Sequence, residues 1–174
     1  MKWLLTLAGF YTPSRKLKAR EHYAKNMKIF LGSDHNGLEL KNALKEFLER
    51  SGHQVVDEGS TKLNPEDDFP VFAAKTVNAM LGSDEADPLG ILICGSGQGM
   101  CMAANRYKGI RSALCWNVAE AHAARNDDNS NILCLSARST SAAEAEKIVS
   151  VWLTTPFAGA PRFIRRLKEL DQLS

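Results

Sequence analysis

One stretch of the sequence limits what the chain can fold into more than any other: an apolar run, a cysteine and then a glycine-rich loop. The run is Gly-Ile-Leu-Ile at positions 90–93, Cys94 follows it, and glycines stand at positions 95, 97 and 99. An apolar run closed by glycines predicts a buried parallel strand that enters a loop. In open α/β sheets, ligands bind outside the carboxyl ends of the strands, and glycines there let backbone amides approach an anion. The stretch therefore predicts a nucleophilic or basic thiol, Cys94, beside an anion-binding backbone.

Two other interpretations compete with this one. A dinucleotide-binding fingerprint needs a third glycine at position 100, where the chain has Met100, so the spacing argues against it. A structural turn with a buried cysteine remains open, because a free cysteine commonly behaves as a small core side chain. The rest of the chain has to decide between a reactive and a structural Cys94.

Length and cysteine usage restrict the class of protein. A chain of 174 residues is long enough for one domain with a full core. Its four cysteines form no CxxC pair, and no histidine stands at ligand spacing from them. This pattern argues against a disulfide framework and against a metal site, and it favours a reduced, cytoplasmic protein.

The first 26 residues differ from the rest of the chain. They carry six of its 22 Lys and Arg side chains but only one of its 20 Asp and Glu side chains, so the remainder is acidic overall. That balance argues against a nucleic-acid partner. The apolar run at residues 3–10 is too short to span a bilayer, so no membrane anchor is expected. We expect residues 1–26 to be a basic extension, a leader or sequence upstream of the real start, and residues 27–174 to be the functional domain.

From residue 27 onward, strand and helix patterns alternate. Strands are expected at 28–32, 54–57, 90–94, 109–116 and 131–135, and helices at 38–50, 70–81, 101–105, 118–125 and 162–170. A further helix begins with a capping box formed by Ser141 and Glu144. The last helix would carry an apolar stripe of Phe163, Leu167 and Leu170. Five strands alternating with helices predict the α/β class, as a three-layer αβα sandwich around a five-stranded parallel, Rossmann-like sheet.

Polar side chains follow the ends of the predicted strands. The groups that parallel strands would bring to one edge are Asp34, His35, the loop 94–99, Asn117 and Arg138. The sequence leaves open which edge the helix-to-strand segment 125–129 faces. Arg162 and Arg166 lie four residues apart on one helix face, an arrangement suited to clamping an anion. Each group alone is equally well explained by a cap, a turn or a solvated face, but their number around one anion-friendly loop favours a site.

These motifs together resemble one family. They are Ser33-Asp34-His35 after the first strand, Ile91 to Gly97 with Gly99, Ala103-Ala104-Asn105, Asp68-Phe69-Pro70, Asn129-Ser130-Asn131 and the pair Arg162 and Arg166. In them the chain resembles ribose-5-phosphate isomerase type B, whose family also contains galactose-6-phosphate and allose-6-phosphate isomerases. The resemblance covers residues 27 to about 168. It implies an enzyme without cofactor or metal, a homodimer or a tetramer, whose sites use residues of both chains.

The resemblance also implies a role for each site residue. Cys94 would be the base that moves a proton between C1 and C2 of the open-chain sugar, and Ser96 would hold the enediolate. The backbone amides that would share this task belong to Gly95, Gly97, Gln98 and Gly99. Asp34 would contact the sugar hydroxyls. The phosphate would be bound by His35, Arg138, Arg162 and Arg166.

Two positions depart from the family's pattern. Asp127, followed by Asp128, stands where the family often has the histidine that opens the sugar ring, and both carboxyl groups are expected at the substrate. Phe69 stands where the family often has tyrosine. A carboxylic acid can still shuttle a proton if burial raises its pKa toward neutrality. The departures leave the ring-opening step and the preferred sugar open.

The sequence thus predicts an aldose–ketose isomerase that interconverts ribose 5-phosphate and ribulose 5-phosphate through an enediolate. An isomerase of a hexose 6-phosphate, such as galactose or allose 6-phosphate, is the alternative within this class. A non-catalytic flavodoxin-like module that binds phosphate or flavin is the alternative from another class. A phosphoacceptor receiver, however, needs an aspartate where this chain has Cys94, and a flavin binder would be yellow when purified.

Overall fold

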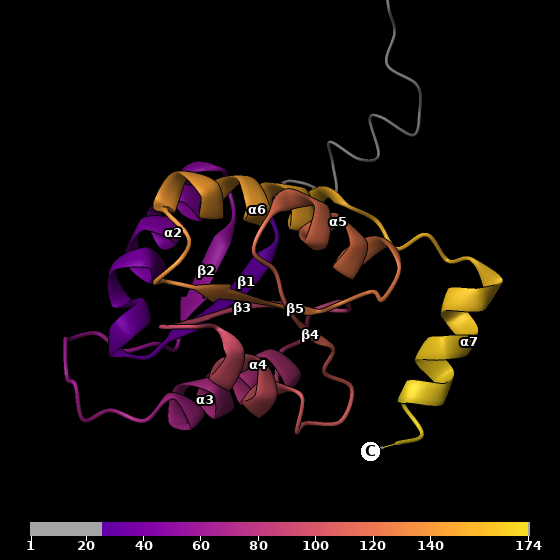
Figure 1. Ribbon diagram of the computed structural model, residues 1–174, viewed down its shortest axis with the longest axis horizontal. Coiled ribbons are helices and arrows are strands. Elements are labelled where there is room, and N and C mark those ends of the chain that lie inside the picture. Colours follow the sequence, from indigo (N-terminus) through magenta and orange to yellow (C-terminus); the bar gives the residue numbers. More distant parts are fainter. Residues whose placement is uncertain (1–25, 174) are drawn as a thin grey trace, which may run out of the picture.

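Five strands form one parallel sheet in the computed structural model, which describes residues 26–173 (Figure 1). The strands are β1 (Lys28–Ser33), β2 (Gln54–Asp57), β3 (Leu89–Cys94), β4 (Ser112–Leu114) and β5 (Ile132–Ser136). Their order across the sheet is β2-β1-β3-β5-β4, and every neighbouring pair is parallel. The predicted parallel sheet is therefore confirmed, whereas the expectations for residues 1–25 lie outside the described residues.

Helices cover both faces of this sheet. They are η1 (His35–Gly37), α2 (Leu38–Arg50), α3 (Phe69–Leu81), α4 (Gln98–Ala104), α5 (Val118–Asn126), α6 (Ala142–Thr154) and α7 (Pro161–Leu170). In Figure 1, α2, α5 and α6 lie on one face and α3 and α4 on the other, which confirms the three-layer αβα sandwich. Within residues 26–173, no helix combines the length and the apolar character that a membrane span requires.

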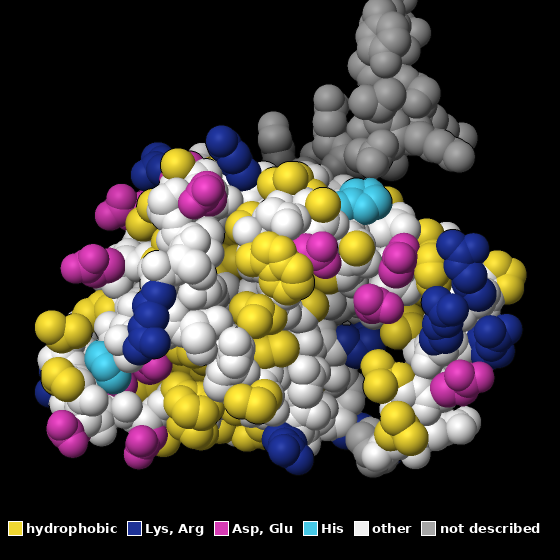
Figure 2. Space-filling view, in the orientation of Figure 1, with side chains coloured by type: hydrophobic (Ala, Val, Ile, Leu, Met, Phe, Trp, Pro, Cys, Tyr) yellow, Lys and Arg dark blue, Asp and Glu magenta, His cyan; other side chains and the backbone are white. Residues whose placement is uncertain are grey.

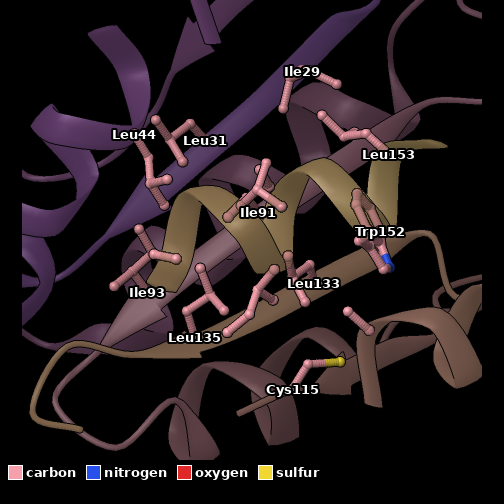
Figure 3. Close-up of a cluster of buried hydrophobic side chains, with 14 of the residues drawn as sticks. Ile29, Leu31, Leu44, Ile91, Ile93, Cys115, Leu133, Leu135, Trp152 and Leu153 are labelled. Carbon is pink, nitrogen blue, oxygen red and sulfur yellow. The ribbon is translucent and has the colours of Figure 1, made fainter. Parts of the chain in front are cut away.

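The core follows from the alternation of side chains along β3. All six residues of β3 are buried, as expected for a strand that is covered on both faces. Ile91 and Ile93 pack with Leu133 and Trp152 on the side of α2, α5 and α6 (Figure 3). The alternate residues of β3 point to the opposite face and pack beneath α3 and α4. Cys94 belongs to this second set, so its thiol lies on the α4 side of the sheet.

Local signals set the helix boundaries. The Asn117 side chain accepts a hydrogen bond from Glu120 N at 2.9 Å, and Ser141 and Glu144 form the predicted capping box. α4 begins at position 98, before the expected start at 101. Gly97 directly precedes it with a φ of 74°, a left-handed conformation that lets the loop turn into the helix at once.

β4 is shorter than the strand expected over 109–116. It lies at the edge of the sheet, where only β5 pairs with it. Gly109 has a φ of 79°, which interrupts an extended run. The Asn105 side chain accepts a hydrogen bond from Ser112 N at 2.8 Å and donates one to Ser112 O at 2.9 Å. Asn105 therefore ties the end of α4 to the start of β4 and fixes where the strand begins.

The last helix carries the expected apolar stripe, but little of it is covered. Of Phe163, Leu167 and Leu170, only Phe163 is buried, and Leu170 is 49% exposed. α7 stands apart from the sandwich at the right of Figure 1. Within this chain, α7 therefore leaves part of its apolar face uncovered.

His53 makes part of the stability depend on pH. It lies between α2 and β2, is 9% exposed, and its Nδ1 has no hydrogen-bond partner among the described residues. Burial lowers the pKa of His53 below its ordinary value of 6.5. As the pH falls below about 6.5, His53 therefore binds a proton in the unfolded chain before it does so in the folded chain. Stability from the neutral imidazole is present above the unfolded pKa and is lost as the pH falls below it.

We expect the free energy of unfolding to fall between about pH 7.5 and about pH 5.5 by more in the wild-type protein than in His53→Gln. The difference is at most about 1.4 kcal/mol per pH unit, the limit for one proton. Urea unfolding of both proteins at the two pH values measures it, and the remaining titrating groups act equally in both proteins. Equal losses in the two proteins would contradict the role of His53.

Candidate active site

Cys94 ends β3 at the carboxyl edge of the sheet. It is buried on the α4 side, with 5% of the residue exposed. The Gly97 backbone N–H donates a hydrogen bond to Cys94 Sγ at 3.1 Å. The sulfur is thereby held against the turn of the loop. The fold thus brings the thiol and a loop amide together.

The loop after this thiol has no room for side chains at its glycines. A Cβ at Gly95 would lie 3.0 Å from Arg138 Nε, and a Cβ at Gly99 would lie 2.9 Å from the Phe69 ring. Such contacts would force the loop or its neighbours to move. The glycines therefore let the Arg138 guanidinium and the Phe69 ring close on the loop.

Arg138 and Ser96 border the same loop. The Arg138 backbone N–H donates to Gly95 O at 3.1 Å, and the Ser136 hydroxyl donates to the same oxygen at 2.9 Å. Ser96 is exposed, and its Oγ accepts a hydrogen bond from Gln98 N at 3.4 Å. These hydrogen bonds join the end of β5 to the loop. The Arg138 guanidinium and the Ser96 hydroxyl therefore lie at the loop that follows Cys94.

Asp34 follows β1 at the same edge. Its Oδ1 accepts a hydrogen bond from Gly37 N at 3.1 Å, so the carboxylate caps η1. The side chain is buried, and burial raises the pKa of Asp34 above its ordinary value. The hydrogen bond from Gly37 and the charge of His35 oppose this increase, whereas Asp67 adds to it. A buried carboxyl group at the strand ends is well placed to accept hydrogen bonds from substrate hydroxyls.

His35 is held by a residue that the sequence analysis does not select. Asp67 Oδ1 lies 2.5 Å from His35 Nδ1 and accepts a hydrogen bond from the His35 backbone N–H at 3.1 Å. On the other side of the ring, Asn36 Nδ2 lies 2.8 Å from His35 Nε2. Asp67 belongs to the polar loop between β2 and α3, where the three consecutive carboxylates at 66–68 are the only signal that the sequence offers.

A second group of predicted site residues lies at the opposite edge of the sheet. Ile132 pairs with Gly90, so Asp127 and Asp128, which shortly precede Ile132, lie near the starts of the strands. Cys94 stands at the other end of β3, four residues beyond Gly90 and about 13 Å away at the usual rise of a parallel strand. The segment 125–129 therefore lies at the edge away from the thiol.

Arg162 and Arg166, on α7, also belong to this far edge (Figure 1). Arg166 and Asp128 line one cavity of about 590 Å³ between α7 and the sandwich. Burial raises the pKa of Asp128, its neighbour Asp127 raises it further, and Arg166 opposes both effects. The Arg162 guanidinium lies over the Phe163 ring, 4.4 Å from its centre. Within one chain, the arginine pair therefore lies away from the glycine-rich loop.

The other three cysteines are less suited than Cys94 to be the reactive thiol of this site. Contact with the Cys134 thiol lowers the pKa of Cys101 to about 6, but Cys101 Sγ lies 3.3 Å from Ser112 O, at the start of β4. Burial raises the pKa of Cys115 to about 12 and that of Cys134 well above its ordinary value. Cys115 directly follows β4, but it packs on the face of the sheet opposite Cys94, so among the four thiols Cys94 alone combines a strand end with the glycine-rich loop.

The carboxyl edge thus collects a thiol, backbone donors, a buried carboxyl group, an imidazole and a guanidinium. These groups can remove a proton from carbon and stabilise the oxyanion that results. Among residues 26–173, no group of three or more His, Cys, Asp or Glu side chains is placed to hold a metal ion.

Comparison with known proteins gives relatives that match most of the chain. The ribose-5-phosphate isomerase B of Mycolicibacterium paratuberculosis is 40% identical over 146 residues, which are 84% of this chain and 91% of the relative. The probable ribose-5-phosphate isomerase B of Mycoplasma pneumoniae is 45% identical over 134 residues, which are 77% of this chain and 87% of the relative.

Solved structures agree with these relatives. The ribose 5-phosphate isomerase of Thermotoga maritima has a TM-score of 0.79 and 44% identity, covering 84% of this chain and 98% of that one. The Mycoplasma genitalium ribose-5-phosphate isomerase B with bound ribulose 5-phosphate has a TM-score of 0.79 and 41% identity, covering 86% and 97%. The model of the ribose/galactose isomerase family matches residues 29–170. The chain therefore belongs to the ribose/galactose isomerase family.

Proposed function

We propose that this protein is an aldose–ketose isomerase that interconverts ribose 5-phosphate and ribulose 5-phosphate. The observation that carries the proposal is the thiol of Cys94 at a strand end, with the Gly97 amide 3.1 Å from its sulfur, in a chain of this family. Relatives at 40% and 45% identity are named as ribose-5-phosphate isomerases, and one solved relative has ribulose 5-phosphate bound.

In the proposed mechanism, the Cys94 thiolate removes the proton from C2 of open-chain ribose 5-phosphate. The electron pair of that C–H bond forms the C1–C2 double bond of an enediolate, whose oxyanion is held by the amides of the loop 95–99 and by Ser96. Each such preorganised donor is worth about 3 kcal/mol of barrier lowering. A proton then moves from O2 to O1, which leaves the negative charge on O2. Return of the abstracted proton from Cys94 to C1, as the O2 electron pair forms the C2 carbonyl, gives ribulose 5-phosphate.

The substrate is held by groups from both edges of the sheet. Asp34 binds sugar hydroxyls, and His35 and Arg138 bind phosphate at the carboxyl edge. Four further groups come from a second copy of the chain, because they lie at the far edge of their own sheet: Asp127, Asp128, Arg162 and Arg166. The proposed unit is a homodimer with two shared sites.

Uncovered apolar surface supports this assembly. Trp116 is 63% exposed just after β4, near the carboxyl edge, and the stripe of α7 is partly uncovered at the other edge. Figure 2 shows apolar side chains on α7 beside its lysine and arginine side chains. Large exposed apolar side chains on a globular chain mark interaction surfaces. A second copy would cover them.

We assign the isomerase to residues 27–174 and expect it to work in a reducing compartment such as the cytoplasm. All four cysteines are free, which suits such a compartment. The proposed site residues lie between Asp34 and Arg166, outside the basic extension at residues 1–26.

The deciding experiment is an isomerisation assay of the purified full chain with ribose 5-phosphate, ribulose 5-phosphate, allose 6-phosphate and galactose 6-phosphate. We expect the highest kcat/KM with the pentose phosphates. A higher kcat/KM with a hexose phosphate would show that the substrate is a hexose 6-phosphate. This alternative is tested because Asp127 and Phe69 depart from the family's pattern. No turnover with any of the four sugars, together with flavin absorbance, would favour the non-catalytic module.

Asp127→Asn is expected to slow the use of cyclic ribose 5-phosphate by about 10²-fold, the range for a lost general acid–base group. Asp127 ends α5, and its Oδ1 accepts a hydrogen bond from Asn126 Nδ2 at 2.7 Å. Ribulose 5-phosphate cannot close a furanose through its 5-position, so its first turnover should change less. Because the equilibrium constant links the steady-state rates, the measurement is pre-steady-state.

His122→Ala is the matched control for Asp127→Asn. His122 is exposed on α5, a little more than one turn before Asp127. Normal first-turnover use of cyclic ribose 5-phosphate by Asp127→Asn, with a loss in His122→Ala, would transfer the ring-opening role to His122.

A further inference from the structure

The side chain of Asp67 makes two hydrogen bonds, and both are to His35. Its Oδ1 meets the ring at Nδ1, 2.5 Å away, and the backbone N–H of the same residue at 3.1 Å. The two residues are 32 positions apart, on the loop after β2 and at the end of β1. One carboxylate oxygen therefore fixes both the backbone and the ring of His35.

The second oxygen of Asp67 has no structural task among the described residues. Asp67 Oδ2 is buried and has no hydrogen-bond partner there, and the side chain is 10% exposed. A buried carboxylate is costly unless its hydrogen bonds offset the loss of water. The hydrogen bonds that compensate the Asp67 carboxylate are both made with His35. A carboxylate that only stabilised its own loop would instead bond to groups of that loop.

The loop that carries Asp67 is anchored independently of it. Ser60 N donates to Ser33 O at 2.8 Å, and Gly59 N donates to Asp57 Oδ1 at 3.0 Å. The buried Lys41 ammonium holds Asp57 at 2.7 Å and 2.9 Å. These contacts hold residues 57–60 at the start of the loop without Asp67, and the side-chain hydrogen bonds that Asp67 adds are those to His35.

The contact at Nδ1 determines what the other ring nitrogen can do. A carboxylate accepts only, so the proton between Asp67 and the ring belongs to His35 Nδ1. Nε2 is then the nitrogen left to face a ligand, and in the present arrangement only the exposed Asn36 amide meets it, at 2.8 Å. When Nε2 also carries a proton, the ring becomes a cation that donates toward an anion, with Asp67 behind it.

We propose that Asp67 is a positioning residue for substrate binding: it fixes the ring of His35 so that Nε2 meets the phosphate of the substrate. The proposal rests on the proposed function, in which His35 binds that phosphate. Asp67 itself touches no reacting atom.

The test compares Asp67→Asn and Asp67→Ala with the wild-type full chain in the isomerisation assay. Asp67→Ala should raise KM for ribose 5-phosphate about tenfold, the scale of one hydrogen bond to a charged group, with kcat within about twofold. Asp67→Asn keeps an oxygen that can accept from Nδ1, so it should recover part of the lost affinity. Glu66→Gln is the control, because it removes the same charge from the same loop and leaves His35 alone.

A double-mutant cycle with His35→Ala separates positioning from a direct contact. If Asp67 acts through His35, Asp67→Ala changes KM little once His35→Ala is present. Additive increases in KM would overturn the proposal, and so would an unchanged or lower KM in Asp67→Ala. Inhibition by inorganic phosphate gives a second readout, with the inhibition constant expected to rise in parallel with KM.

Failure of the proposed function has a different signature. If the wild-type protein shows no isomerase turnover, the proposed function is wrong, whatever the variants do. If the wild-type protein is active and the Asp67 variants have an unchanged KM, only the positioning role of Asp67 is wrong. A fall in kcat and thermal stability without a change in KM would mean that Asp67 merely stabilises the loop, and would equally overturn the proposal.

Discussion

Cys94→Ala is expected to lower kcat for ribose 5-phosphate by about 10²- to 10⁴-fold, the range for losing a general base. The proposed mechanism assigns the proton transfer from carbon to Cys94 alone, whereas Asp34 and His35 at the same edge bind the substrate. The variant should still fold, because Cys94 is a small side chain and the change removes one sulfur atom from the core. Circular dichroism and urea unfolding check the fold, and the isomerisation assay checks turnover.

Cys101→Ala is the matched control. Cys101 is the thiol whose pKa is lowered to about 6, yet its sulfur contacts Ser112 O at the start of β4, and only its backbone N–H meets the loop, at Gly97 O. We expect this variant to keep near-normal kcat. If Cys101→Ala loses turnover while Cys94→Ala retains more than about a tenth of it, the base has been assigned to the wrong thiol.

The fold could be predicted because its signals are local. The run at 90–94 is apolar throughout, as a strand covered on both faces requires, and the caps at Asn117 and Ser141 need only three or four residues of context. The position of Cys94 follows from the same signals, since a strand end and a glycine-rich loop suffice to place it.

What the sequence could not provide depends on distant contacts. Asp67 meets His35 across 32 positions, and no periodicity reports such a pairing. The uncovered face of α7 has the same apolar spacing as a buried one, so its pattern alone could not reveal that the helix stands apart from the sandwich. The edge occupied by the segment 125–129 became clear only from the pairing of Ile132 with Gly90.

Mixing two inactive variants is expected to restore activity if the proposed site is shared between chains. One variant is Cys94→Ala, and the other carries both Arg162→Ala and Arg166→Ala. Within one chain, Cys94 and the segment that meets Arg166 lie at opposite ends of the strands, about 13 Å apart along β3. A shared site in a two-fold dimer would pair Cys94 of one copy with the arginines of the other.

The size of the recovery follows from symmetry. When the two variants exchange subunits at equal concentration, about half of the dimers are mixed, and each mixed dimer has one intact site of two. Activity should therefore rise from near zero to about a quarter of the wild-type value. The control mixes Cys94→Ala with the triple variant that also carries both arginine substitutions, a pair that cannot form an intact site. If subunits exchange, as shown by a mixed species with two distinct affinity tags, and activity still stays at the level of this control, each site is built within one chain and the shared-site dimer is wrong.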